Sequence, residues 1–555
     1  MEYINNKILV DFLKKHGIKK IVLSSGSRNI PFISTVEVDE DFECFSVVDE
    51  RNAAFFGMGL AQESKEYVAI ACTSGTAVSN YVSGVSEAFF SNVPLVVITF
   101  DRSPYVLNQL ETQKIDQMSL FDSITKKNIN LPVIKDEEDV WYCQRILNEA
   151  FIALKNNGGG PIHINVPLIG DANDMMEDGQ HKYEINDIKF IDYYDLHSSF
   201  EDIYVAFKGK NILFVFGQDI VLSHDEKSII REFVEKYNIP VLTDSLSNFK
   251  SSKNINASRV IKGLNSKTIQ KYLPDIVITY GLNFQERTKD LLKANARSFE
   301  HWAVCEDGII RDCFKSQTKI IQTKITDFCK QIMKKVDAYE TEYFEKWKKL
   351  DEHAVLPELP YSNFSVIGSF LKVIPNNSLL HLSILNATRL AQFFEIDESV
   401  RVFSNVNTFG IDGNLPTFLG QAYCTEDLSF IIVGDLSFFY AMNALQIRHI
   451  KNNVRILVVN NFGGGEFYIS PGASKNKTID LHIGAKHTIN AEGWSQSAGF
   501  EYLSVRAEDE LYDKLKTFVD ISDKPIVLEV FTETASDGQV TLDVYRKLEE
   551  KLGEL

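Results

Sequence analysis

Short apolar segments alternate with longer amphipathic segments along nearly the whole chain. In the first block, residues 21–23, 67–72 and 95–100 are almost continuously apolar, and each run leads into a polar loop. Strands that are apolar throughout are typical of parallel sheets covered by helices on both faces. The pattern predicts an α/β block, which opens with a helix over residues 4–16 and closes with a strand at 160–167.

The same alternation returns in a second block. A polar stretch at residues 171–195, rich in Asp, Asn and Glu, predicts a linker, and apolar strands are expected after it at 212–216 and 276–280. The strongly charged segment 334–353 then predicts an exposed helix followed by a linker.

The third block contains the most regular unit of the sequence. An apolar strand is predicted at 430–433, a helix from there to about His449, and a second strand at 454–459. The first and third blocks share this organisation. The sequence therefore predicts an α/β fold of three doubly wound parallel-sheet domains, with boundaries at residues 1–182, 183–353 and 354–555.

Composition restricts the kind of protein this is. Of 555 residues, 44% are hydrophobic, and 58 Lys+Arg against 76 Asp+Glu give a net charge of −18. Such an acidic surface repels phosphate backbones, which argues against nucleic acid and anionic membranes as partners. No apolar run is long enough to span a membrane, and Glu2, Asn5 and Lys7 interrupt the start as no secretory signal would.

Cysteine and histidine usage points to the cytoplasm and away from zinc. The seven cysteines are scattered without a Cys-x-x-Cys pair, and His482 and His487 lack the spacing of a helical zinc site. Scattered thiols of this kind are expected to be reduced and buried. We therefore expect a cytoplasmic protein without structural zinc.

Candidate metal ligands follow the two predicted strands of the third block. Asp435 comes after the first strand and Asn461 after the second, at the sheet edge where open α/β folds bind ligands. A carboxylate, an amide oxygen and a backbone carbonyl of the turn, here that of Gly463, are hard oxygen ligands that suit Mg²⁺. Gly464 and Gly465 let the backbone approach a phosphate group closely. The pattern predicts a magnesium site that holds a phosphorylated ligand.

This unit resembles the diphosphate-binding motif of thiamine diphosphate (ThDP) enzymes. The resemblance implies that the first block supplies a carboxylate to the pyrimidine ring of the cofactor, and Glu50 stands at the matching place. In this superfamily the Glu shares a proton with a pyrimidine nitrogen and so activates the cofactor, which requires a carboxylate in a site with little water.

Motifs along nearly the whole chain are similar to those of one branch, the SEPHCHC synthase family (2-succinyl-5-enolpyruvyl-6-hydroxy-3-cyclohexene-1-carboxylate synthase) of menaquinone biosynthesis. They lie at residues 25–29, 49–51, 73–77, 101–104, 410–413 and 434–437. The resemblance implies a transferase that uses ThDP and Mg²⁺, decarboxylates 2-oxoglutarate and adds the remaining acyl unit to isochorismate. It also implies a homodimer, commonly a dimer of dimers, with the cofactor between the first domain of one chain and the third of the other, and a largely structural central domain.

Residue roles follow from the resemblance position by position. Cofactor contacts are implied for Glu50, Thr73, Ser74, Gly75, Ile411, Gly434, Asp435, Leu436, Ser437, Asn461, Gly463 and Gly464. Ile411 matches the apolar residue that keeps the cofactor bent. Substrate contacts are implied for Ser27, Arg28, Gln113, Arg287 and Arg389, and Gln113 is also a catalytic candidate beside Glu50.

Several neighbours of the substrate residues depart from the family pattern. Glu286 stands where the family has a lysine, Val406 where it has an arginine, and Phe409 where it has a small residue. Each charge-assisted contact to a carboxylate is worth about 1.5–3 kcal/mol. Two lost cations and one gained anion would therefore weaken binding of a dianionic acceptor strongly.

Other departures point the same way. The segment 383–388 replaces the Gly-Asn-Ser run of the family. Ile384 and Leu385, together with Val406 and Phe409, therefore predict an acceptor pocket whose wall is bulkier and more apolar. Glu466 follows the metal loop and falls near the pocket. The sequence thus predicts a 2-oxoacid decarboxylase-carboligase, with 2-oxoglutarate as the leading donor and an altered, unidentified acceptor.

Three other interpretations remain open. The chain could be a divergent SEPHCHC synthase whose missing cations are replaced from elsewhere, a catalytically silent partner subunit, or a flavin-carrying relative such as an acetohydroxyacid synthase. Glu50, Asp435 and Asn461 are all present, which argues against a silent subunit, and the motif set argues against a flavin enzyme. Residues 57–62 resemble part of a dinucleotide fingerprint but are predicted to lie inside a helix and to serve packing.

Overall fold

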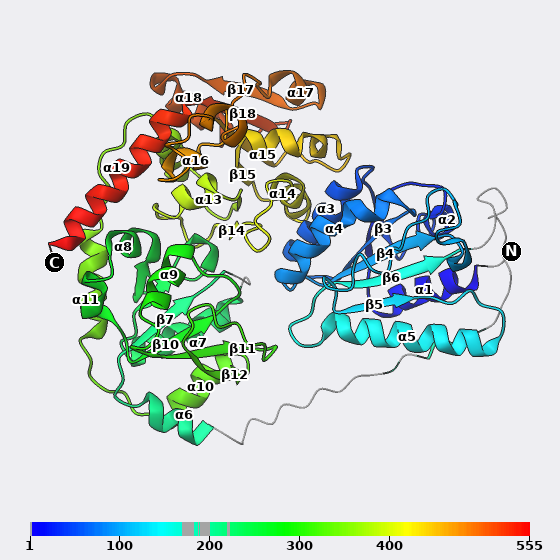
Figure 1. Cartoon of the computed structure of the whole chain (residues 1–555), viewed down its shortest axis with the longest axis horizontal. Helices are drawn as coiled ribbons and strands as arrows, with labels where there is room; N and C mark the ends of the chain where they lie inside the picture. Colours follow the sequence, from blue (N-terminus) through cyan, green and yellow to red (C-terminus); the bar gives the residue numbers. More distant parts are fainter. Residues whose placement is uncertain (1–2, 169–182, 187, 189–199, 219–221, 555) are drawn as a thin grey trace.

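The computed structural model of the chain describes residues 3–168, 183–186, 188, 200–218 and 222–554. These residues form three six-stranded sheets, and every strand pair found among them is parallel. Figure 1 shows an N-terminal domain in blue and cyan beside a green central domain and a yellow-to-red C-terminal domain. The predicted α/β class with three doubly wound parallel sheets is confirmed, and the predicted linker at 171–195 lies largely outside the described residues.

The N-terminal domain has the strand order β2-β1-β3-β4-β6-β5. Its strands are β1 (Lys20–Leu23), β2 (Glu43–Ser46), β3 (Val68–Cys72), β4 (Leu95–Asp101), β5 (Lys127–Asn130) and β6 (Ile162–Pro167). Its helices are α1 (Ile4–Lys15), α2 (Ile30–Val36), α3 (Glu50–Ser64), α4 (Thr76–Phe90) and α5 (Glu137–Lys155).

The central domain has the strand order β12-β11-β10-β7-β8-β9. Its strands are β7 (Ile212–Phe216), β8 (Val241–Thr243), β9 (Asn254–Asn256), β10 (Ile276–Tyr280), β11 (Glu300–Cys305) and β12 (Gln317–Gln322). Its helices are α6 (Phe200–Phe207), α7 (His224–Lys236), α8 (Ala257–Gly263), α9 (Glu286–Ala294), α10 (Ile325–Lys335) and α11 (Tyr343–His353).

The C-terminal domain has the order β14-β13-β15-β16-β18-β17, which repeats that of the N-terminal domain strand for strand. Its strands are β13 (Leu379–Leu382), β14 (Arg401–Phe403), β15 (Ser429–Gly434), β16 (Val454–Asn460), β17 (Glu501–Val505) and β18 (Ile526–Phe531). Its helices are α12 (Asn363–Leu371), α13 (Asn386–Ala391), α14 (Asn414–Tyr423), α15 (Asp435–Tyr440), α16 (Glu466–Ile469), α17 (Glu492–Ser497), α18 (Glu508–Phe518) and α19 (Thr534–Gly553).

Two predicted helices differ in the structure. The helix expected to reach His449 ends as α15 at Tyr440, because Ala441 leaves helical geometry with φ −112° and a 3₁₀ turn follows at Met442–Gln446. The segment 334–353 is not an exposed helix plus linker. Its last part is α11, which buries Trp347 and Leu350 while its charged side chains face solvent.

The C-terminal sheet shares a hydrophobic core with each of the other domains. Phe430 and Ile432 of β15 belong to a core that includes central-domain residues, whereas Ile431 and Val433 pack with the N-terminal helices. This division follows from the geometry of a strand, whose successive side chains point to opposite faces. The C-terminal sheet therefore fixes both neighbours at once.

In the described part of the chain, no helix combines the length and hydrophobicity needed to cross a membrane.

Helices α3 and α14 form the closest contact between the N-terminal and C-terminal domains (Figure 1). A Cβ at Gly59 of α3 would overlap the carbonyl oxygen of Thr417, and a Cβ at Gly420 of α14 would overlap that of Phe56. Only glycine allows two backbones to approach this closely. The segment 57–62 thus lies in a helix and serves packing, as predicted.

We expect Gly59→Ala to destabilise the protein by about 1–3 kcal/mol, because a methyl group forced into a packed contact displaces backbone on both helices. Thermal unfolding followed by circular dichroism measures the effect. Gly493→Ala is the matched control, since Gly493 lies in α17 and its Cβ would meet no atom within 4 Å. An equal effect of the two substitutions would show that the helix contact is not tight.

Candidate active site

The predicted N-terminal site residues meet at the carboxyl edge of their sheet. The backbone N–H of Arg28 donates to Thr73 Oγ1 (3.2 Å), and Gln113 Nε2 donates to the carbonyl oxygen of Ser74 (3.2 Å). Gly75 has φ +79°, and a Cβ there would lie 2.9 Å from Gln113 Cγ. The loops that follow β1 and β3 are therefore joined to the loop that carries Gln113, and Ser27 lies exposed beside them.

A buried polar network holds this edge in place. Gln117 accepts a hydrogen bond from the Gly75 N–H (3.1 Å) and donates to Asn165 (2.8 Å), which in turn donates to Asp101 (3.1 Å). Lys114 completes the network with a 2.6 Å ion pair to Asp101, and both side chains are only 5% exposed. Because each buried polar group has a partner, the network fixes the loop around Gly75 and Gln113.

Glu50 is the first residue of α3, and Asp49 caps the helix by accepting the N–H of Asn52. Burial raises the pKa of Glu50 above its ordinary value; its backbone hydrogen bond opposes this and the charge of Asp49 adds to it. Burial favours the protonated carboxyl because it removes water from the charged form. The protonated form of Glu50 is thus more favoured than that of an exposed glutamate.

The predicted metal residues also lie close together, at the carboxyl edge of the C-terminal sheet. Asp435 is 3% exposed; its Oδ1 accepts the Leu436 N–H (2.6 Å) and its Oδ2 accepts the Gly463 N–H (2.9 Å). Asn461 is 6% exposed and donates through Nδ2 to Asp537 (3.2 Å), which leaves its amide oxygen for another partner.

His487 also contacts this site, although no sequence motif marks it. Its Nδ1 accepts the backbone N–H of Ile489 (3.1 Å), so in the neutral ring Nε2 carries the proton, and Nε2 lies 3.2 Å from Asp435 Oδ2. The imidazole thus lies beside the Asp435 carboxylate, although Nε2 makes no hydrogen bond of good geometry. No spacing rule could have identified His487, because its loop reaches Asp435 only through the fold.

Ile411 and Ser437 are joined directly, since Ser437 Oγ donates to the Ile411 carbonyl oxygen at 2.7 Å. Ser437 Oγ also accepts a hydrogen bond from Ser383 Oγ at 3.3 Å. The segments 410–413 and 434–437, which the sequence resemblance singled out separately, thus form one surface next to Asp435.

Arg389 lies beside the metal loop but is already paired. Its guanidinium forms a two-contact ion pair with Glu466, with Nη2 at 3.0 Å from Oε1, and its Nη1 also donates to Asn386 Oδ1 (3.2 Å). A Cβ on Gly465 would touch the side-chain amides of both Asn386 and Asn461. Arg389, Glu466 and the metal loop therefore form one continuous group, in which Glu466 lies next to the predicted substrate residue Arg389.

Arg287 comes from the central domain, on α9, and donates to the carbonyl oxygen of Leu264 at the end of α8 (3.4 Å). Its neighbour Glu286 is exposed and, with Glu466, raises the pKa of Arg389, against the lowering effect of burial. The central domain thus contributes charge to the C-terminal site.

Comparisons with known proteins agree with this geometry. Residues 6–120 match the family described as "Thiamine pyrophosphate enzyme, N-terminal TPP binding domain". A protein of Bacteroides fragilis named 2-succinyl-5-enolpyruvyl-6-hydroxy-3-cyclohexene-1-carboxylate synthase is 35% identical over 97% of this chain and 98% of its own length. Proteins of the same name from Bacteroides thetaiotaomicron and Flavobacterium johnsoniae are 33% and 28% identical, over 98% and 97% of this chain and 98% of their own lengths.

The chain belongs to the SEPHCHC synthase family of ThDP enzymes. It is accordingly an enzyme that forms carbon–carbon bonds.

The residues at the two sheet edges fit the cofactor of this family. A Cβ at Gly434 would enter open space. Gly463 has φ +155°, and a Cβ there would collide with the Gly484 carbonyl oxygen. In the described part of the chain, no three His, Cys, Asp or Glu side chains form a metal site on their own.

The predicted apolar wall is only partly present in this member of the family. Ile384 and Val406 are 5% and 8% exposed and belong to the hydrophobic core, so the prediction that they line the pocket is wrong. Phe409 is 50% exposed and Leu385 is half-buried, with φ +61° and +65°. Any apolar wall therefore rests on Leu385 and Phe409.

The central domain has the 3-2-1-4-5-6 strand order of dinucleotide-binding folds, yet its crevice between β7 and β10 is closed by its own loops. The Gln218 N–H donates to the Asn283 carbonyl oxygen (2.7 Å), and the Leu282 N–H donates to that of Gln218 (2.9 Å). A Cβ at Gly281 would lie 2.8 Å from the Gln218 oxygen. These contacts argue against a flavin or nucleotide in this crevice.

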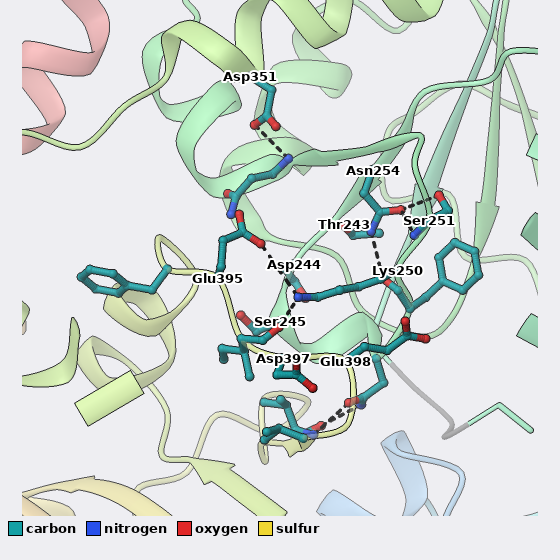
Figure 2. Close-up of a pocket in the computed structure, with 17 residues that line it drawn as sticks. Thr243, Asp244, Ser245, Lys250, Ser251, Asn254, Asp351, Glu395, Asp397 and Glu398 are labelled. Atoms are coloured by element: carbon teal, nitrogen blue, oxygen red, sulfur yellow. Dashed lines mark hydrogen bonds and ion pairs between the residues drawn. The ribbon is translucent and has the colours of Figure 1, made fainter. Parts of the chain in front are cut away.

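Figure 2 shows a separate pocket of about 290 Å³ between the central and C-terminal domains. Its lining includes Asp244, Lys250, Glu395, Asp397 and Glu398 and none of the predicted site residues. Asp244 is partly buried, and the loss of water around its carboxylate raises its pKa to about 6, against the lowering effect of hydrogen bonds from the Leu246 and Ser247 backbone. The pocket is therefore distinct from the candidate active site.

Proposed function

We propose that this chain is a ThDP- and Mg²⁺-dependent decarboxylase-carboligase that takes a dicarboxylic 2-oxoacid, with 2-oxoglutarate as the leading donor, and an acceptor other than isochorismate. The observation that carries the proposal is the ion pair of Arg389 with Glu466. It lies beside an intact set of cofactor residues, so the binding of anions has changed while the catalytic machinery has not.

Asp435, Asn461 and the carbonyl oxygen of Gly463 would hold Mg²⁺, and Gly434, Leu436, Ser437 and Gly464 would surround the diphosphate. Bound ThDP would supply a nucleophilic thiazolium carbon and an electron sink for decarboxylation. His487 would lie beside the ion next to Asp435, and Ile411 lies against the same surface through its contact with Ser437.

Glu50 would hold a proton at a pyrimidine nitrogen, with Thr73, Ser74 and Gly75 forming the adjoining wall. The raised pKa of Glu50 supports this role, because the carboxyl must share its proton rather than release it to water. Gln113, fixed by Ser74, would orient the substrate next to Ser27 and Arg28.

The same arrangement favours a homodimer. Val48, just before Glu50, is 71% exposed, and Tyr440, at the end of α15, is 55% exposed. Large apolar side chains beside catalytic residues are typical of surfaces covered by a partner. We propose that a second copy, in a dimer or dimer of dimers, completes each site, and that the protein acts in the cytoplasm, where its seven free thiols would stay reduced.

A divergent SEPHCHC synthase of menaquinone synthesis is the second candidate. The names and nearly full-length similarity of the relatives favour it. The two candidates differ in the acceptor, so an assay separates them directly.

We expect weak or no product from 2-oxoglutarate and isochorismate, together with clear release of CO₂ from 2-oxoglutarate. The reason is that Glu466 occupies Arg389 and Glu286 adds a second negative charge where a dianionic acceptor would bind. Steady-state kinetics on the purified enzyme measures both reactions. A kcat/KM of about 10⁴ M⁻¹s⁻¹ or more with isochorismate would establish the second candidate instead.

Glu50→Gln is expected to lower turnover by about 10²–10⁴-fold, because glutamine keeps the shape but cannot share the proton. Glu508→Gln is the matched control, since Glu508 is likewise the first residue of a helix, α18, but is exposed. Turnover and unfolding temperature are measured for both. Near-normal turnover of Glu50→Gln would remove Glu50 from this role.

Asp435→Ala is expected to abolish Mg²⁺-dependent binding of ThDP, because the substitution removes the single charged protein ligand proposed for the ion. Calorimetric titration with ThDP, with and without Mg²⁺, measures this. The exposed Asp513 provides the control variant Asp513→Ala. Unchanged affinity in Asp435→Ala would place the metal elsewhere.

A further inference from the structure

A buried carboxylate of the N-terminal domain binds the loop that leads to Ile411. Glu87 lies in the last turn of α4 and is 1% exposed. Its Oε1 accepts the backbone N–H of Asn407 (3.2 Å), and its Oε2 accepts both the backbone N–H (2.6 Å) and the hydroxyl of Thr408. Both loop residues belong to the C-terminal domain. Glu87 therefore connects the two cofactor-binding domains through three hydrogen bonds.

The loop supplies most of the donors that this buried carboxylate needs. A carboxylate inside a protein is costly unless hydrogen-bond donors replace its lost water. Besides the loop donors, Glu87 Oε1 accepts the hydroxyl of Ser91 (3.2 Å), and Ser91 Oγ in turn accepts Asn407 Nδ2 (2.9 Å). A displacement of the loop would leave the carboxylate without most of these partners, so the contact is more costly to break than an exposed hydrogen bond.

Helix α4 is itself fixed within its domain. A Cβ at Gly84, one turn before Glu87, would lie 2.6 Å from the Cβ of Ala54 on α3 and 3.1 Å from its carbonyl carbon. The helix begins at Thr76, directly after the segment 73–75 that is proposed to adjoin the cofactor. Glu87 thus holds the loop from a closely packed helix, and the other end of that helix adjoins a proposed half-site.

The loop makes a strained turn between Thr408 and Ile411. Phe409 has φ +61° and is 50% exposed, and a residue other than glycine keeps this conformation only where its surroundings hold it. The segment 407–412 borders a hollow of about 530 Å³, so packing does not support it on that side. After the turn, the Ile411 carbonyl oxygen accepts Ser437 Oγ at 2.7 Å. Glu87 and Ser437 therefore hold the two ends of the turn.

We propose that Glu87 is a positioning residue, which holds the turn at Phe409 and thereby sets where Ile411 meets the cofactor. The proposal rests on the proposed function, in which Ile411 keeps ThDP bent. In the proposed dimer, Glu50 and Ile411 of one chain serve different copies of the cofactor. Because α4 follows the segment 73–75 and carries Glu87 in its last turn, this helix fixes the relation between the two half-sites of each chain.

The contact of Glu87 with the loop is tested on the protein without its cofactor. Hydrogen exchange followed by mass spectrometry measures a peptide that spans residues 405–412. Glu87→Gln should speed amide exchange in this peptide about tenfold or more, because the amide group cannot accept the hydrogen bonds of both pairs of donors. An unchanged exchange rate would show that Glu87 does not hold the loop.

The effect on the site is measured by calorimetric titration of the same variant with ThDP and Mg²⁺. The apparent affinity for ThDP should fall about 5- to 100-fold, because only the fraction of molecules with the loop in place binds tightly. Unchanged affinity despite faster hydrogen exchange would mean that the loop is held but that its position does not matter to the cofactor, which would overturn the proposal.

Glu63→Gln is the matched control. Glu63 lies on α3 and also joins the N-terminal to the C-terminal domain, since its Oε1 lies 3.1 Å from Arg401 Nη2, and its side chain is only 11% exposed. This variant should lower the unfolding temperature but leave ThDP affinity within about twofold. An equal loss of affinity in the two variants would mean that any weakening of the domain contact has this effect.

A double-mutant cycle separates positioning from a merely structural role. If Glu87 acts through Ile411, Glu87→Gln should cost little further ThDP affinity in the Ile411→Ala background. Additive losses would show that Glu87 acts by another route. Thr408→Val removes one donor and keeps Glu87, so it should give the same pattern more weakly, and it replaces Glu87→Gln if that variant does not fold.

Failure of this proposal is distinguishable from failure of the proposed function. If the wild-type protein bound no ThDP, the proposed function would fail, and the role of Glu87 with it. If the wild-type protein bound ThDP and Glu87→Gln bound it equally well, only the positioning role would fail.

Discussion

The contact between α3 and α14 determines how the two cofactor-binding domains meet. Gly59 and Gly420 let the two helices touch backbone to backbone, and α3 begins at Glu50 while α14 follows directly after Ile411–Gly413. A displacement of either helix would shift Glu50 relative to the segment 410–413 of the same chain, and so would shift the two half-sites that each copy is proposed to present to its partner. Positions that lie on different sheets of one chain are thereby held in a fixed relation, which a site shared between two copies requires.

The central domain closes the crevice in which its fold type binds nucleotides. Its strand order is that of a nucleotide-binding fold, yet the loops after β7 and β10 are hydrogen-bonded to each other across the crevice. It meets the C-terminal site through helices instead, with Arg287 on α9. A fold can therefore keep its architecture without keeping the binding site typical of it.

Local sequence predicted most of the fold and part of the site. The strands at 212–216 and 276–280 were predicted to the residue, because a continuous apolar run between polar loops is typical of a strand buried on both faces. The helix after Asp435 was predicted too long, since nothing in the sequence marks Ala441 as a break. Asp435 and Asn461 lie at the same edge of the sheet, as predicted, because each directly follows a strand of that sheet.

His487 could not be predicted in this way. Its contact with Asp435 depends on a loop that only the fold brings back to the edge of the sheet. The prediction that Ile384 and Val406 line the pocket was wrong for a related reason. Their positions match pocket residues of the family, but both side chains are buried in the core shared with the central domain. Neither composition nor local pattern indicates which distant segments of the chain will pack together.

The packing of α19 on α8 has a consequence for biosynthesis. Gly263 is translated about 285 residues before Leu548, against which it packs. At roughly 5–20 residues per second, that interval is on the order of tens of seconds. The central domain can form its own sheet on the ribosome, but the face of α8 that α19 covers stays open until the C-terminal helix has emerged.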